Sequence, residues 1–304
     1  MSCQILQYRI SEVVPYINWV YFFHAWGMEP RFAQIAEVHD CPSCRAGWIA
    51  SFAEAERAKA REAISLYTDA MNMLRQWSKE PICQAKFLLA DAYSEGDDIL
   101  INGIRFPFLR QQQAGKKGYT LCLSDFIREF PTVVPTIQES ELADIANKIG
   151  VFATSVTPPS VAATQYATLL ASTLSDRLAE ATAEKMHEEV RRFHWGYAKE
   201  EQLSIRQLHN EEFQGIRPAV GYPSLPDQSI NFLIDRLIQF SDIGITLSTS
   251  GAMSPASSVS GFMIAHPQAC YFSIGEIGED QLRDYALRRG LCTEELLSFL
   301  ENNL

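Results

Sequence analysis

The 304-residue sequence lacks the features of membrane, secreted and nucleic-acid-binding proteins. No run approaches 18 consecutive apolar residues, and the first residues lack the basic start and apolar core of a signal peptide. Lys and Arg total 26 against 37 Asp and Glu, so the net charge of -11 offers no basic surplus for phosphates. We therefore expect a cytoplasmic globular protein that binds neither membrane nor nucleic acid.

Several short catalytic and nucleotide-binding motifs are also missing. The sequence contains no G-x-G-x-x-G after a predicted strand, no G-x-x-x-x-G-K-[ST], no H-E-x-x-H and no G-x-S-x-G. These absences argue against the common dinucleotide and P-loop folds, the zinc proteases and the serine hydrolases. Function must be sought elsewhere in the chain.

Cysteines are few and irregularly spaced. Seven cysteines, an odd number in a chain of this length, predict reduced thiols and not a disulfide framework. The segment VHDCPSC places His39, Cys41 and Cys44 within six positions, and these side chains could supply three corners of a tetrahedral zinc site. A single CxxC without a second pair is weak evidence, so we favour a loop with free thiols and assign no metal.

Long amphipathic patterns predict helices over much of the chain. Residues 52–77 combine high helix propensity with apolar residues at steps of three and four. Residues 161–194 form a second long helix whose buried stripe runs from Leu170 to Phe193. Ser204 with Gln207 resembles a capping box, and Asp227 is placed to cap the helix that follows it. The last predicted helices are 279–289 and 293–302, with Gly290 between them.

Strand patterns lie between these helices. The predicted strands are 85–94, 98–102, 119–126, 149–156, 245–250, 258–266 and 269–277. Several are joined by connections too short for a helical crossover, which predicts antiparallel pairing and the α+β class. With no repeat, low-complexity segment or linker, we expect one domain over residues 1–304.

Three segments are candidates for a binding site. The segment IRPAVGYPSLPD, residues 216–227, holds Arg217 at the front of a stiff, extended run that is short of amide donors. The aromatic cluster at 16–26 has Asn18 as its polar member. The small residues of 252–262 allow backbone to approach closely either a strand or a flat ligand, and we favour the strand.

Eight blocks of sequence together resemble a known family. They resemble the C-terminal activation domain of cobalamin-dependent methionine synthase and occur in the same order as in that family. The blocks are YINWVYFFHAW, GDDI, LRQQQAGKKGYTLCLSDF, DRLAEATAEKMHEEVRR, WGYA, GIRPAVGYPSLPD, AMSPASSVSG and HPQACYF. The resemblance covers roughly residues 10–290. It implies a single C-shaped unit around a bent, mainly antiparallel sheet flanked by long helices.

The resemblance also implies a function and its partners. Such a domain binds S-adenosylmethionine and sits over cobalamin carried by another domain, and a flavodoxin-like donor supplies an electron to the inactive cob(II) form. The sequence lacks the D-x-H-x-x-G cobalamin loop, since FFHAWG has Phe22 at the aspartate position. We therefore expect the cobalamin to come on a partner, a truncated methionine synthase or other corrinoid protein.

Site residues follow from the resemblance position by position. Arg217 would pair with the carboxylate of S-adenosylmethionine, and the backbone at Ala219 and Gly221 would reach the ligand. The remaining expected contacts are Tyr222, Tyr271, Phe272, Asn18, Glu180 and Glu211. No catalytic residue is expected, because a transferred methyl group has no proton to remove.

Three positions depart from the family. Asn18 stands where the family has aspartate, Gln228 where it has histidine, and Ser254 where it has tryptophan. We favour a freestanding reactivation module for methionine synthase. The alternatives are a corrinoid-protein scaffold or ligand sensor that has lost methyl transfer, and a zinc protein built on His39, Cys41 and Cys44.

Overall fold

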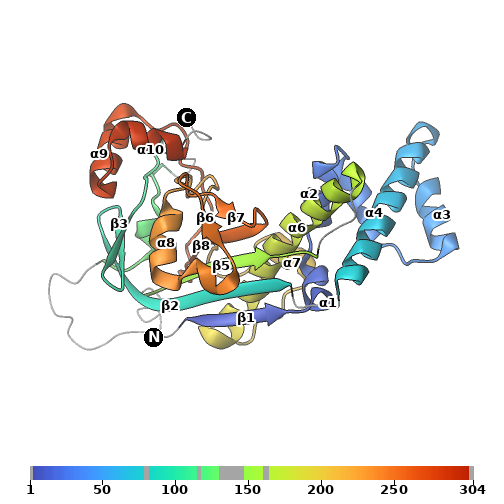
Figure 1. Cartoon of the computed structure of the whole chain (residues 1–304), viewed down its shortest axis with the longest axis horizontal. Coiled ribbons are helices and arrows are strands. Elements are labelled where there is room, and N and C mark those ends of the chain that lie inside the picture. Colours follow the sequence, from blue (N-terminus) through green and yellow to red (C-terminus); the bar gives the residue numbers. More distant parts are fainter. Residues whose placement is uncertain (1–2, 79–81, 115–117, 130–146, 160–163, 301–304) are drawn as a thin grey trace.

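A six-stranded antiparallel sheet forms the centre of the fold (Figure 1). The computed structural model describes residues 3–78, 82–114, 118–129, 147–159 and 164–300. The strands of the sheet are β1 (Gln4–Tyr8), β2 (Cys83–Glu95), β3 (Asp98–Ile101), β4 (Ile104–Pro107), β5 (Lys148–Val156) and β8 (Ser258–Met263). All five of its pairings are antiparallel, which confirms the predicted α+β class.

The long strand β2 carries the bend of the sheet. Its first part, from Cys83, lies between β1 and β5, whereas its last four residues, Ala92–Glu95, pair with β3. In Figure 1, β2 runs along the lower edge and turns upward to meet β3. One strand therefore belongs to both halves of the sheet, and the predicted bent sheet is confirmed.

Both faces of the sheet are buried. Along β5, Phe152 belongs to the apolar cluster under helix α6 (Gln165–Glu189), and its neighbour Val151 belongs to the cluster under helix α8 (Ile230–Ile238). Successive side chains of a strand point to opposite faces, so a strand covered on both sides has no polar face. This arrangement explains the nearly continuous apolar run from Ile149 to Val156.

The helices lie on the two faces and at the ends of the sheet. The α-helices are α1 (Ile10–Val13), α2 (Trp19–Ala25), α3 (Pro42–Ala50), α4 (Arg57–Trp77), α6 (Gln165–Glu189), α7 (Ile205–His209), α8 (Ile230–Ile238), α9 (Glu279–Arg289) and α10 (Thr293–Leu300). Short 3₁₀ turns are η1 (Val14–Tyr16), η2 (Pro30–Glu37), η3 (Glu54–Glu56), η4 (Leu123–Phe126) and η6 (Phe240–Ile243). Among the described residues, no helix is both long enough and apolar enough to cross a membrane.

Helix α6 follows the predicted pattern except at its end. The predicted buried residues from Leu170 to Val190 are buried, but Phe193 is 67% exposed. The helix continues into a π-helical turn, η5 (Val190–His194), which widens each turn and rotates the following side chains out of the stripe. The predicted start at 161–163 lies outside the described residues.

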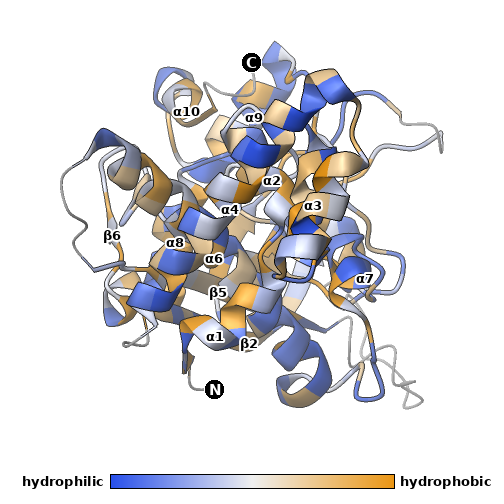
Figure 2. Cartoon of the chain, turned by 90° about the vertical axis from the view of Figure 1, so that its right-hand side faces the viewer, coloured by the Kyte–Doolittle hydropathy of each residue, from blue (hydrophilic) through white to orange (hydrophobic). Residues whose placement is uncertain are grey.

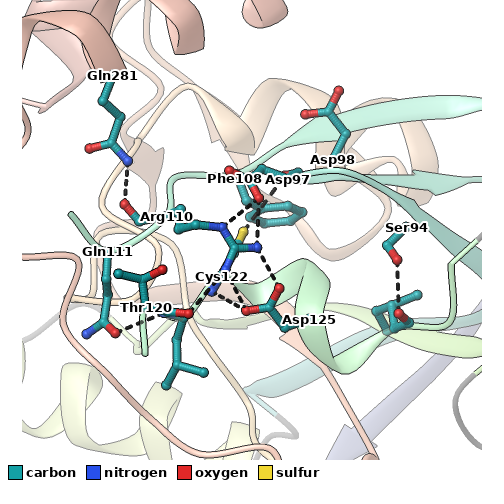
Figure 3. A network of polar contacts seen from close by, with 12 residues as sticks. Ser94, Asp97, Asp98, Phe108, Arg110, Gln111, Thr120, Cys122, Asp125 and Gln281 are labelled. Atoms are coloured by element: carbon teal, nitrogen blue, oxygen red, sulfur yellow. Dashed lines mark hydrogen bonds and ion pairs between the residues drawn. The ribbon is translucent and has the colours of Figure 1, made fainter. Parts of the chain in front are cut away.

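Two predicted strands are wrong. Residues 119–126 instead contain the 3₁₀ turn η4, because the Asp125 carboxylate accepts the Cys122 N–H at 2.8 Å and closes a capping box. Arg110 holds the same carboxylate through two N–H groups and also pairs with Asp97 (Figure 3). Residues 269–277 form no strand either.

Other differences concern short strands. The strand predicted at 245–250 is reduced to β6 (Thr246–Leu247), which pairs with β7 (Met253–Ser254), and β8 ends at Met263. Strands β1, β4 and β7 were not predicted. Each is five residues or shorter, so alternation gives little signal there.

Helix boundaries test the predicted caps. Ser204 and Gln207 form the predicted capping box, and Gly290 is the left-handed cap of α9. The prediction for Asp227 is wrong, since α8 begins after Ser229. The Asp227 carboxylate instead accepts from the Ser229 N–H, the Tyr285 hydroxyl and Arg289. It therefore fastens α9 to the start of α8.

The expectation of reduced cysteines is wrong for one pair. Cys41 and Cys44 form a disulfide, while the other five cysteines are free. The two positions flank the start of α3, where the first helical turn brings their Cα atoms within 5.3 Å. That separation lies in the range a disulfide requires, so proximity along the chain and not a secreted framework explains the bond.

Candidate functional site

A cavity of about 720 Å³ lies between α6, the N-terminal segment around α2, and the segment 216–224. This volume is within the range of small-molecule sites. Its lining is aromatic and charged, with Tyr16, Asn18, Tyr21, Arg177, Glu180, Ala181, Glu184, Leu208, His209, Glu211, Arg217, Pro218, Ala219, Tyr222, Pro223, Ser224, Val259, Tyr271 and Phe272.

The segment 216–220 forms the wall beside the sheet. It runs along the free side of β8, where the Val220 N–H donates to the Ser260 carbonyl at 2.9 Å and the Phe262 N–H donates to the Pro218 carbonyl at 3.0 Å. A Cβ atom at Gly261 would lie 2.2 Å from the Pro218 carbonyl oxygen. The small residue is therefore needed for close approach of two backbones, as predicted for the strand alternative.

The same segment then turns at Gly221. Its φ of 88° is in the region that favours glycine, and a Cβ atom there would lie 2.4 Å from Gln228 Nε2. Gly221 does not line the cavity, unlike its neighbour Tyr222. The Tyr222 hydroxyl donates to the Glu180 carboxylate, and both residues line the cavity.

Arg217 is held at the base of this wall. Its backbone N–H donates to the Tyr271 hydroxyl at 2.8 Å, and its guanidinium donates to Glu184 Oε2 at 2.8 Å and to His187 Nδ1 at 3.1 Å. Arg217 therefore pairs with a protein acid, yet it also lines the open cavity beside Tyr271. A guanidinium has five N–H groups. Among the described residues, these two side chains accept hydrogen bonds from two of its five N–H groups.

The Arg217–Glu184 pair is shielded from solvent. Each side chain is 12% exposed. Burial alone would lower the pKa of Arg217, but the charge and hydrogen bond of Glu184 together with the charges of Tyr271 and Glu180 outweigh it, and the net direction is upward. Arg217 is thus a permanent cation in the cavity wall. Within the described part of the chain, Glu184 Oε1 is buried without a hydrogen-bond partner.

His187 forms a second layer behind Arg217. It is completely buried, and burial together with the charges of Arg191 and Arg217 lowers its pKa well below the usual value. The imidazole is therefore neutral and accepts from Arg217 through Nδ1. Arg191 is itself neutralised by a forked pair with Glu201. This layer fixes the orientation of the Arg217 guanidinium.

One face of α6 supplies three of the charged residues that line the cavity. Arg177, Glu180 and Glu184 follow one another at steps of three and four, so they lie on the same side of the helix. With Glu211 and Arg217, the described lining holds three carboxylates and two guanidiniums. Burial raises the pKa of Glu211, partly opposed by Arg217. The cavity as a whole favours a ligand with net positive charge.

Asn18 lies at the opposite wall and also caps a helix. Its side-chain oxygen accepts the Val20 N–H at 3.1 Å at the start of α2. The amide oxygen is thus engaged in local structure, and the residue lines the cavity without charge.

The structure brings eight of the nine expected site residues to one cavity. Asn18, Glu180, Glu211, Arg217, Ala219, Tyr222, Tyr271 and Phe272 line it, and Gly221 supports it from behind. Sequence reasoning missed Glu184 and His187. The spacing of Glu184 from Glu180 on one helix was a readable signal for the first. Nothing in the sequence indicated that His187 would face Arg217, thirty positions away.

The fold and cavity define a class of protein: a bent-sheet α+β domain with an open cavity lined by guanidinium and carboxylate groups. Comparison with known proteins gives the family. A model of the vitamin B12 dependent methionine synthase activation domain matches residues 9–290. The chain belongs to this family.

A solved structure is similar over the whole chain. It is described as a crystal structure of the MetH reactivation domain bound to AdoHcy. It shares 30% sequence identity with this chain at a TM-score of 0.79, and the match covers 100% of this chain and 90% of that chain.

Proposed function

We propose that this protein is an S-adenosylmethionine-binding reactivation module that acts on cobalamin carried by a separate methionine synthase or other corrinoid protein. The observation that carries the proposal is the buried Arg217–Glu184 pair, which faces an open cavity lined by further carboxylates. Support comes also from the similar domain, which was solved with AdoHcy, the demethylated form of the same ligand.

The charges of the cavity fit S-adenosylmethionine. The ligand has one carboxylate, one ammonium group and one sulfonium group, hence a net charge of about +1. Other N–H groups of Arg217 would bind the carboxylate through charge-assisted hydrogen bonds, and Tyr271 would flank it. Glu180, Glu184 and Glu211 would offset the two positive groups. AdoHcy lacks the sulfonium charge, so the cavity should prefer the methylated ligand.

The role of the chain in methyl transfer would be positional. When bound, S-adenosylmethionine supplies an activated methyl group. The protein needs no general base for that transfer, because no proton leaves the methyl carbon. Its residues would hold the ligand at one orientation and so reduce the entropy cost of alignment with the metal of the partner. A flavodoxin-like protein would supply the electron.

Cobalamin itself would be held by the partner. Phe22 stands where the D-x-H-x-x-G cobalamin loop, which the sequence lacks, would have aspartate; it is fully buried and packs edge-on against Trp19 and Phe23. Such a side chain offers no polar group to a corrinoid. The residues of this chain therefore fit S-adenosylmethionine and not a resident cobalamin.

A methyl-transfer assay tests the proposal. The full chain is mixed with a corrinoid protein loaded with cob(II)alamin, a chemical reductant and S-adenosylmethionine that carries a radiolabelled methyl group. We expect label to appear on the corrinoid only when this chain is present, and Arg217→Lys to reduce the yield at limiting ligand. Binding measured by calorimetry without any stimulated transfer would refute the reactivation role.

A second candidate is a scaffold or ligand sensor for a corrinoid protein. Asn18 favours it, because a neutral side chain replaces a charge at the cavity wall. Ser254 favours it as well, since this exposed residue of β7 replaces a bulky aromatic of the family pattern. Under this alternative, complex formation with the corrinoid protein would depend on S-adenosylmethionine, while the methyl group stays on the ligand.

A further inference from the structure

The loop before α3 gathers three soft side chains outside the cavity. His39, Cys41 and Cys44 offer one ligand atom each, and all three atoms lie within 4.8 Å of one another. None of them lines the cavity described above. In Figure 1, α3 lies at the end of the molecule beside α4, and in Figure 2 this end faces the viewer. The cluster is therefore spatially separate from the proposed ligand site.

Local hydrogen bonds fix the shape of this loop. Cys41 is the N-cap of α3, and its sulfur accepts the Cys44 N–H at 3.1 Å. The Cys41 N–H donates to the His39 carbonyl at 2.8 Å, which holds the histidine over the helix start. An amide directed at a sulfur stabilises negative charge on it, as at other helix N-termini. The backbone thus presents both sulfurs to the same side as the imidazole.

The spacing suits a tetrahedral metal centre. Zinc binds sulfur at about 2.3 Å and histidine nitrogen at about 2.0 Å, so its ligand atoms lie roughly 3.5 Å apart. Once the disulfide is reduced, the two sulfurs must move apart and the imidazole must approach them, and the exposed side chains of His39 and Cys44 are free to rotate for this adjustment. Thiolate and imidazole ligands select zinc over calcium or magnesium. The obstacle is the Cys41–Cys44 disulfide, which must first be reduced.

We propose that the reduced loop binds one zinc ion through His39, Cys41 and Cys44, with the fourth position open to water or to a donor atom of another molecule. Reduction consumes two electrons and two protons from a dithiol, which is itself oxidised to a disulfide, and leaves two thiols on the protein. Zinc then replaces the two thiol protons, which pass to solvent. The site with two thiolates, a neutral imidazole and the divalent ion is electrically neutral.

The oxidised and metal-bound forms exclude each other. Each sulfur can either bond to the other sulfur or bind the metal as a thiolate. Zinc therefore binds only when Cys41 and Cys44 are reduced. Neighbouring charges are balanced, because Asp40 pairs with Arg45 at 2.9 Å. Metal binding would join the end of η2 to the start of α3, and α3 packs on the core through Trp48 and Ile49. Zinc should therefore raise the thermal midpoint of the reduced protein.

Metal titration of the reduced full chain tests the proposal. The protein is reduced with a phosphine, freed of metal, and titrated with zinc in competition with a chromophoric chelator; cobalt(II) serves as the spectroscopic probe. We expect one zinc per chain, a thiolate-to-cobalt charge-transfer band, and loss of at least tenfold in affinity in Cys41→Ser, Cys44→Ser and His39→Gln. The oxidised protein should bind none.

Cys292→Ser is the matched control. The Cys292 sulfur also accepts an amide N–H three residues along, from Glu295 at 3.4 Å, at the start of α10, and it belongs to no such cluster among the described residues. This variant should bind zinc as the wild type does. Circular dichroism and S-adenosylmethionine binding, measured on every variant, show whether the fold is kept. Equal zinc binding by the reduced wild type and a folded Cys41→Ser/Cys44→Ser variant would overturn the proposal, and unchanged affinity in His39→Gln would overturn the three-ligand assignment.

Discussion

Replacement of Asn18 by aspartate should restore a charge to the cavity without disturbing the fold. Asn18 caps α2 through its side-chain oxygen, and aspartate caps helices about as well as asparagine. The carboxylate would keep the hydrogen bond to the Val20 N–H, and the N-terminus of a helix tolerates negative charge. We therefore expect Asn18→Asp to change the free energy of unfolding by less than about 1 kcal/mol.

The effect on ligand affinity follows from Coulomb's law. A new carboxylate about 4 Å from a sulfonium contributes about 1 kcal/mol in water and about 4 kcal/mol at an effective dielectric constant of 20. These values correspond to a gain in affinity of about fivefold to several-hundred-fold. The cavity is open to solvent, so the gain should shrink as ionic strength rises.

Isothermal titration calorimetry with two ligands measures how much the charge of the new carboxylate contributes to the free energy of binding. S-adenosylmethionine should bind Asn18→Asp more tightly than the wild type, while S-adenosylhomocysteine, which has a neutral sulfur, should show a much smaller change. Asn72→Asp is the matched control, because Asn72 is an exposed residue of α4 that does not line the cavity. Equal gains for both ligands, or an equal gain in the control, would refute the electrostatic explanation.

Two further predictions concern the residues behind the cavity wall. Arg217→Ala should abolish measurable S-adenosylmethionine binding and also destabilise the fold by about 3 kcal/mol, because it leaves Glu184 largely buried without a partner. The double variant Arg217→Ala/Glu184→Gln should recover stability but not binding. Denaturant titration measures stability and calorimetry measures binding, and Arg283→Ala, at an exposed position, should change neither. The free energy of unfolding should fall as pH drops below about 6.5, because the unfolded chain can protonate His187 and the folded chain cannot. His187→Gln should flatten this dependence relative to the exposed His24→Gln, and parallel curves for the two variants would contradict the assignment.

Periodicity along the chain was enough for the long elements of the fold. The pattern that predicted a helix over 52–77, where α4 spans Arg57–Trp77, and the apolar runs of β2 and β5 are local properties. Each exceeds the length at which helix and strand signals become distinct. Short antiparallel connections likewise indicated the α+β class. The 119–126 segment failed because its apolar alternation competed with a capping aspartate whose geometry depends on the distant Arg110.

The residues of the site could be named from the sequence, but their interactions could not. The resemblance of the RPAVGYP segment and of the block around Asn18 to a known family named the side chains that surround the cavity, but it could not show how they interact with one another. Arg217 lines the cavity and also donates hydrogen bonds to Glu184 and His187. The side-chain oxygen of Asn18 accepts a hydrogen bond that caps α2. These roles arise from contacts between residues that are remote in sequence or that depend on where a helix begins.

The amino-acid sequence by itself determined the class of fold, the long helices and the family to which the chain belongs, because these depend on local propensity, periodicity and motif order. Only the tertiary structure decided which charges neutralise one another and which remain open to a ligand. Pairing energies between charged groups depend on distance and burial. Both are set by the packing of α6 near the segment 216–220, which lies beside β8 in the folded chain although it precedes β8 in the sequence.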